Sequence, residues 1–245
     1  MKKFDFNLGK YIYDLIKKPF RTKIEFILLI LETIKIINNP NITSNSAMGK
    51  IILKIDKMNR LFYEVENKIF SIQFPFFIEK EKDQNNFRIY DNELGKVIDN
   101  KTTSVLIGIF FGKDDKATFD KISFENFFET LYSPSKEDKN IETEDLWKLI
   151  KKLILFDIGY LRYDYDEKHA NGKLHPLNHL DINYESNATY KIGLDDKIKI
   201  EDLIDIVDST SECSFLNILS KWKKKIVRVY ATLCKLKDNR MILFL

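Results

Sequence analysis

The sequence predicts an α+β protein in which an antiparallel sheet is flanked by N-terminal and C-terminal helices. Apolar residues recur at spacings of three and four over residues 10–38 and again close to the end of the chain. Over residues 50–112 they instead alternate with polar residues, and turn-forming residues separate the runs. No internal repeat and no Gly/Ser-rich or Pro-rich linker divides the chain. We therefore expect a single α+β domain over residues 1–245.

The first part of this domain, residues 1–48, is expected to be helical. The apolar spacing continues from Leu15 to Ile34, but Pro19 lacks a backbone N–H and predicts a break between two helices. Pro40 and the polar residues after it then end the second helix.

The sheet-rich middle, residues 49–120, has strand-like alternation at 51–55 and 72–76. Turn-forming residues occur at 56–59, 83–86 and 91–95. The continuous β-branched and aromatic run Val105–Phe111 has the composition of a strand that is buried on both faces, so we expect it at the centre of the sheet.

The last part, residues 121–245, is expected to contain a helix, a histidine-bearing hairpin and the C-terminal helices. Helical patterns occur at 123–132, 143–156, 200–207 and 215–236, and strand-like patterns occur between 159 and 194. The final helix carries a basic stripe that is typical of a solvated face, and it is also where backbone contacts to RNA would be expected: Lys221, Lys223, Lys224, Lys225 and Arg228.

Composition excludes several classes of protein. Forty Lys and Arg against 37 Asp and Glu give a net charge of +3, so no strong overall field indicates a nucleic-acid or membrane partner. The uncharged run Thr102–Gly112 is far shorter than the ~20 residues of a membrane helix. Cys213 and Cys234 are the only cysteines, so we expect neither a disulfide framework nor a zinc finger, and we expect a cytoplasmic protein. The phosphate-loop, GxSxG, HExxH and GxGxxG motifs are absent.

The unusual chemistry of the chain is concentrated in one segment. All three histidines, His169, His175 and His179, lie between residues 169 and 179, and Arg162 is the only arginine between Arg88 and Arg228. Alternation over 160–166 and 177–184 predicts two strands, and Asn171-Gly172 predicts the turn between them.

In this hairpin one face is polar. Arg162 and Asp164 of the first strand share it with His179 and Asp181 of the second, while Leu180 and Ile182 point inward. Cross-strand neighbours on such a face approach to ~5 Å, which allows direct hydrogen bonds. The turn brings His175-Pro176 to the start of the second strand.

Three interpretations of this cluster remain open. In the first, His175 and His179 are an acid/base pair, Arg162 stabilises phosphate charge, and Asp164 or Asp181 orients an imidazole. Such a site cleaves RNA without a metal or other cofactor, because the 2′-hydroxyl is the nucleophile. In another, the histidines and the ion pairs are purely structural, and the protein is a non-catalytic subunit or a binding module.

The remaining interpretation is a divalent metal that is held by His175 and His179 with Asp164, Asp166 or Asp181. Positions i and i+4 lie ~6 Å apart on a helical turn and can share an ion, whereas on a strand they lie ~13 Å apart and cannot. The alternating residues after His179 favour a strand, while Pro176 allows a single turn.

The segment also resembles a known family. The order Arg162-x-Asp164-Tyr-Asp166, then His175-Pro-x-x-His179-Leu, is similar to the signature of an uncharacterised family of bacterial proteins, and the resemblance covers residues 159–210. Small bacterial toxins with an Arg-x-Asp … His-x-His pattern are distantly similar. Their members are commonly RNA-cleaving or are associated with phage defence. The family pattern has an Arg in the strand after the histidines, where this chain has Tyr190-Lys191.

The resemblance implies an effector of a bacterial toxin or phage-defence system. Together with the residues, it favours a metal-independent ribonuclease-like activity, acting on RNA or with a partner protein encoded nearby. The expected site residues are His175, His179, Arg162, Asp164 and Asp181. The alternatives are a non-catalytic nucleic-acid-binding or protein-binding module and a divalent-metal-dependent nuclease or hydrolase that uses the same cluster.

Overall fold

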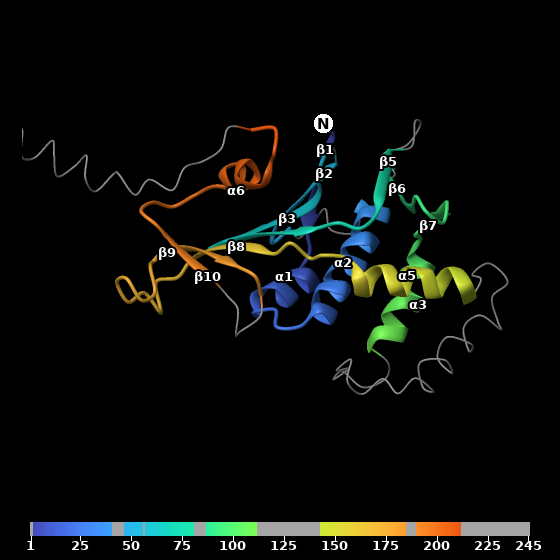
Figure 1. The fold of residues 1–245 in the computed structure, drawn as a ribbon, viewed down its shortest axis with the longest axis horizontal. Coiled ribbons are helices and arrows are strands. Elements are labelled where there is room, and N and C mark those ends of the chain that lie inside the picture. Colours follow the sequence, from blue (N-terminus) through green and yellow to red (C-terminus); the bar gives the residue numbers. More distant parts are fainter. Residues whose placement is uncertain are drawn as a thin grey trace, which may run out of the picture. The chain divides into compact units, whose positions relative to one another are not determined.

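The fold was analysed in a computed structural model that describes residues 2–40, 47–55, 57–80, 87–111, 143–184 and 190–211. By its internal contacts the chain divides into two units, Met1–Asp208 and Ser209–Leu245, and every described helix and strand belongs to the first. This unit combines antiparallel sheets with helices near both of its ends, so the predicted α+β class is confirmed (Figure 1).

The main sheet has seven strands in the order β1-β2-β3-β4-β8-β9-β10, and every neighbouring pair is antiparallel. Its strands are β1 (Lys2–Leu8), β2 (Gly49–Ile55), β3 (Asn59–Val65), β4 (Lys68–Gln73), β8 (Leu161–Tyr165), β9 (Asn178–Ile182) and β10 (Tyr190–Leu194). The pairing of β4 with β8 therefore joins the N-terminal meander to the histidine-bearing segment, which lies about ninety residues later in the chain.

Helices cover both faces of this sheet. On one face lie α1 (Lys10–Lys17) and α2 (Lys23–Asn38), where Thr33 hydrogen-bonds Tyr63 of β3 and Phe26 contacts the ring of Tyr160. On the opposite face α6 (Ile200–Val207) packs in a second apolar cluster with Phe62, Tyr163 and Leu180 (Figure 1). Consecutive strand residues point to opposite faces, so alternation along β8 divides its side chains between these two environments.

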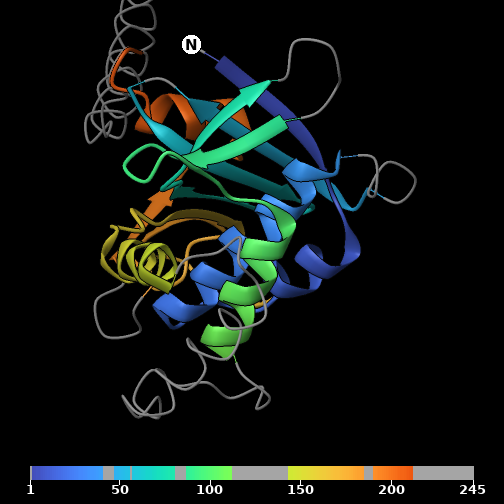
Figure 2. The same cartoon turned by 90° about the vertical axis from the view of Figure 1, so that its right-hand side faces the viewer.

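A smaller sheet and two helices complete the described fold. The strands β5 (Phe77–Lys80), β6 (Phe87–Asp91) and β7 (Lys96–Val97) form a three-stranded antiparallel sheet. The helix α3 (Asn100–Phe111) packs against α2 (Figure 2), and α5 (Thr143–Leu155) is tied to β6 by an ion pair of 2.5 Å between Lys152 and Asp91.

The prediction of a central strand at Val105–Phe111 is wrong, because this run lies in α3. Among the buried residues of α3, Thr102, Leu106, Ile109 and Phe110 have the spacing of a helix. At the start of this helix, Asp99 accepts a hydrogen bond from the Thr102 N–H. A short continuous apolar run has no periodicity that separates a buried strand from a buried helix.

The prediction of a wholly helical segment 1–48 is also wrong, because its first residues form the edge strand β1. Phe6 and Leu8 are buried, and Phe4 and Phe6 both contact the ring of Phe87. The period-two pattern Phe4-Asp-Phe6-Asn-Leu8 was visible in the sequence and indicates a strand.

Most other elements are confirmed. The break at Pro19 separates α1 from α2, α2 ends before Pro40, and the expected helices at 143–156 and 200–207 are α5 and α6. The alternation at 72–76 is strand only up to Gln73. The expected helices 123–132 and 215–236, with the basic stripe, lie outside the described residues. No helix in the described part of the chain is long and apolar enough to cross a membrane.

Candidate functional site

The polar residues of the histidine segment form two rows across β8, β9 and β10. In the first row Arg162 pairs with Asp181, which pairs with Lys191. In the second row Asp164 pairs with His179, which pairs with Gly193. Directly paired residues of an antiparallel sheet project to the same face, so the register alone brings these side chains together.

The glycine of the second row allows the histidine loop to fold over the sheet. A Cβ atom at Gly193 would lie 2.9 Å from Cγ of Pro176, so Pro176 occupies the space that a larger residue would fill. Upstream, Asn171 and His175 form a narrow bridge around Gly172, which has a positive φ of 51°. The predicted Asn-Gly turn is confirmed, and it brings His175 beside His179, with 4.8 Å between the ring centroids.

Arg162 is enclosed by acidic and phenolic groups. Its Nη2 contacts Asp181 Oδ2, its Nε lies 2.7 Å from Asp164 Oδ2, and its Nη1 donates to the hydroxyl of Tyr160. Burial opposes the charge of Arg162, but Tyr160, Asp164 and Asp181 outweigh it and raise the pKa of the guanidinium. Burial also raises the pKa of Tyr160 to about 12. Arg162 is therefore a fixed positive charge.

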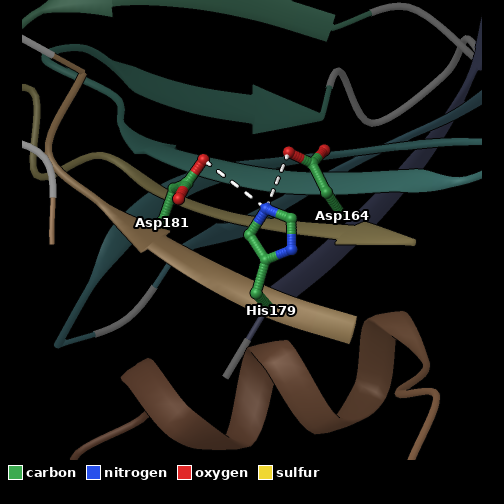
Figure 3. A group of neighbouring side chains, drawn as sticks. All are labelled: Asp164, His179 and Asp181. Carbon is green, nitrogen blue, oxygen red and sulfur yellow. Dashed lines mark ion pairs between the residues drawn. The ribbon is translucent and has the colours of Figure 1, made fainter. Parts of the chain in front are cut away.

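The imidazole of His179 is buried, with 1% of its side chain exposed. Its Nδ1 lies 2.9 Å from the carbonyl oxygen of Pro176, which can only accept, so Nδ1 carries the proton. Its Nε2 lies 3.7 Å from Asp164 Oδ2 and 4.0 Å from Asp181 Oδ2 (Figure 3). The Pro176 carbonyl thus fixes both the tautomer and the orientation of the ring.

Lys191 connects the two histidines. Its Nζ lies 3.3 Å from Nδ1 of His175 and 3.4 Å from Nε2 of His179, and it is 3.7 Å from Asp181 Oδ1. An ammonium group can only donate, so both ring nitrogens accept. About a third of the Lys191 side chain is exposed, so this ammonium links the buried imidazole to the surface.

His175 is oriented from its other side by Asp166. Its Nε2–H donates to Asp166 Oδ2 over 3.2 Å, and its side chain is 26% exposed. Burial would raise the pKa of Asp166, but hydrogen bonds from the His169 side chain and backbone, the His169 charge and the His175 bond outweigh it and lower that pKa. Asp166 is consequently a carboxylate at neutral pH, and it holds the tautomer of His175 in which Nδ1 is basic.

A cavity of about 520 Å³ borders this cluster. The histidine segment contributes Arg162, Asp164, Tyr165, Asp166 and His169 to its wall. The remaining lining comes from α1, from the residues that follow it and from the end of β3, the turn after it and the start of β4. The volume lies within the range of small-molecule and cofactor sites.

Three side chains of the cluster also have the donor types of a metal site. One atom from each of Asp164, His179 and Asp181 lies within 4.8 Å of the others (Figure 3). Asp181 Oδ1 is buried and accepts no hydrogen bond among the described residues. However, the Oδ2 atoms of both carboxylates already contact Arg162, so a cation at this position would have to displace or tolerate the guanidinium.

The structure brings together all five residues that the sequence singled out: Arg162, Asp164, His175, His179 and Asp181. The inward position of Leu180 is confirmed, whereas that of Ile182 is wrong, because Ile182 ends β9 and is 38% exposed. Lys191 is a central member that the sequence analysis did not select. The signal in the sequence was its place in the strand after the histidines, where the pattern of the family that the segment resembles has an Arg.

Comparisons with models of protein families, with curated proteins and with solved structures find no match to this chain. The functional argument therefore depends on the geometry of the cluster.

Proposed function

We propose that the protein cleaves the phosphodiester backbone of RNA without a metal, with His175 as the base. The observation that carries this proposal is the position of the Lys191 ammonium between two imidazoles of fixed tautomer, one of which is partly exposed. The resemblance noted above suggests that this activity belongs to an effector of a bacterial toxin or phage-defence system.

In the proposed reaction Nδ1 of His175 takes the proton of the 2′-hydroxyl, whose oxygen attacks the neighbouring phosphorus. The bond from phosphorus to the 5′-oxygen breaks, and the leaving oxygen takes a proton from Lys191 Nζ. The proton on His175 then returns to Lys191 across the 3.3 Å separation. Arg162 stabilises the charge that develops on the phosphate oxygens, and Asp166 orients His175.

In this scheme His179 is a positioning residue. Its buried ring accepts from Lys191 and holds that ammonium in place beside His175. Asp181 forms an ion pair with the same ammonium. Asp164 and Asp181 together hold Arg162.

The test is cleavage of a labelled RNA oligonucleotide in EDTA by the full chain. We expect products that end in a 2′,3′-cyclic phosphate, and no cleavage where the scissile nucleotide is 2′-deoxy. His175→Ala and Lys191→Met should each lower the rate 10²–10⁴-fold, the usual contribution of a proton-transferring group. Lys10→Met removes an exposed ammonium that belongs neither to the cluster nor to the cavity lining, so it is the matched control for Lys191→Met and should retain activity.

For His179 the readout is the pH profile. His179→Asn should lower the rate and displace the pH–rate profile of His175, because Lys191 loses one of its two imidazole partners. Cleavage of the 2′-deoxy substrate, or full activity of His175→Ala, would contradict the proposal. RNA binding without any cleavage would favour the non-catalytic binding module.

A second candidate, a divalent-metal-dependent nuclease or hydrolase, is favoured by the close approach of Asp164, His179 and Asp181. The residues fit a small cation in donor type, since imidazole and carboxylate are common ligands of zinc and manganese. This candidate predicts stoichiometric binding of Zn²⁺ or Mn²⁺ in calorimetry, loss of binding in Asp181→Asn, and activity that EDTA abolishes. Activity in EDTA decides for the first candidate.

A further inference from the structure

We infer that the cavity beside the cluster binds the sugar-phosphate backbone of a single-stranded RNA segment next to the scissile bond. This inference takes its substrate class from the proposed function, and it adds the location of the strand. Arg162 and Asp166 belong to both the cavity wall and the cluster, and Asp166 hydrogen-bonds His175. A chain lying in the cavity would therefore contact the guanidinium of the proposed site and the carboxylate that orients its base.

Positive groups of three separate elements face this cavity. Lys17 ends α1, Arg21 precedes α2, and Lys68 begins β4. Among the described residues, no carboxylate forms an ion pair with Lys17 or Lys68. Lys17 approaches only the ring of Tyr13, and Lys68 donates to the carbonyl of Ile16 over 3.1 Å. An ammonium group has three N–H donors, so Lys68 retains two for a ligand.

Two of the three acidic groups of the wall, Asp164 and Asp166, are paired within the protein, and the third, Glu66, is exposed in the turn between β3 and β4. Asp164 contacts Arg162, and Asp166 is held by His169 and His175. Burial lowers the pKa of Lys68, and Asp164 and Asp181 act in the opposite direction while Arg162 adds to the effect of burial. An anion in the cavity would satisfy Lys68 and would complement Lys17 and Arg21.

Two rings beside these cations favour a nucleotide chain over an isolated anion. Tyr13 of α1 and the exposed ring of His169 line the same cavity. Cations that follow the backbone and aromatic rings on which bases stack are the combination found in proteins that bind single strands. A volume of about 520 Å³ is large enough for a nucleotide rather than a phosphate alone.

The experiment measures binding of a fluorescent, fully 2′-O-methylated RNA 12-mer, which cannot be cleaved by the 2′-hydroxyl route. The wild-type chain is compared with Lys17→Glu and Lys18→Glu. Both lysines are exposed and adjacent in sequence, but only Lys17 lines the cavity. We expect Lys17→Glu to weaken binding at least tenfold and to make the slope of log K against log salt shallower by about 0.7. Lys18→Glu should change binding less than twofold, and Arg21→Ser should behave as Lys17→Glu does.

Two further arms separate the possible outcomes. Inorganic phosphate should compete only weakly, whereas displacement of the RNA by low-millimolar phosphate would indicate a site for a free anion and would overturn the inference. Equal effects of Lys17→Glu and Lys18→Glu would overturn it as well. His175→Ala should abolish cleavage and leave this binding unchanged, so a chain that binds through Lys17 but cannot cleave refutes the proposed function alone.

Discussion

At the scale of single residues, the site depends on groups whose hydrogen-bonding roles leave no alternative. Pro176 has only an acceptor to offer to His179, and Lys191 has only donors to offer to His175 and His179. These constraints fix which ring nitrogens carry protons. The sequence could predict that the polar residues share a face, because strand alternation determines it. It could not predict the tautomers, because these depend on the path of the loop around Pro176.

The carboxylate of Asp166 gives a prediction about pH. Its pKa is lowered in the folded state, so its stabilising contribution is present above its unfolded pKa of about 3.9 and is lost as the pH falls through the folded value. Wild-type protein should therefore be more stable than Asp166→Asn at pH 6, and the difference should disappear in strong acid. Urea denaturation from pH 6 down to pH 2.5 measures this. Asp196→Asn, which removes an exposed carboxylate before α6, is the control for the loss of one negative charge. A constant difference for Asp166→Asn would show that its hydrogen bonds do not favour the charged form.

At the scale of elements, periodic segments were predictable and aperiodic ones were not. The β8–β9 hairpin was predicted with its polar face because alternation and the Asn171-Gly172 turn agree. The run at Val105–Phe111 contains strand-forming residues but lies in a helix, because its burial against α2 outweighs the preference of these residues for a strand. Lys191 was not selected because β10 has a weak apolar pattern, and its register with Asp181 places it beside the histidines.

Gly193 gives the prediction at this scale, because it couples β10 to the histidine loop. In Gly193→Ala the new methyl group would approach Pro176 to 2.9 Å, so the loop must move and take His175 with it. We expect RNA cleavage to fall at least tenfold with only a modest loss of stability, since the loop itself lies at the surface.

The control is Gly108→Ala in α3, where an added Cβ meets nothing within 4 Å. Because alanine is the better helix former, that control should keep its activity and gain about 0.5–1 kcal/mol in free energy of unfolding. Unchanged activity in Gly193→Ala would show that the loop position is not set by this contact.

At the scale of the whole Met1–Asp208 unit, the sheet holds helices on both of its faces while β9 and β10 extend the polar face from which the site is built. The order of strands could not be predicted, because the pairing of β4 with β8 depends on contacts between segments far apart in the chain. One long-range contact secures α6 to the N-terminal half of the sheet. Lys54 of β2 and Asp208 at the end of α6 form an ion pair of 3.1 Å, and their side chains are 5% and 10% exposed.

The ion pair between Lys54 and Asp208 therefore predicts an asymmetric mutational cycle. Asp208→Leu leaves the ammonium of Lys54 buried without its partner and should destabilise the protein by about 3 kcal/mol. Lys54→Met should lower the free energy of unfolding by less, because Asp208 is at the end of a helix and can turn toward water. The double variant Lys54→Met with Asp208→Leu removes both charges and should recover most of the loss, since an apolar pair of similar volume replaces a buried ion pair at little cost. Urea denaturation of the four proteins measures the coupling free energy. Additive effects of the two substitutions would mean that solvent screens the pair, and that α6 is held to the sheet by its apolar face alone.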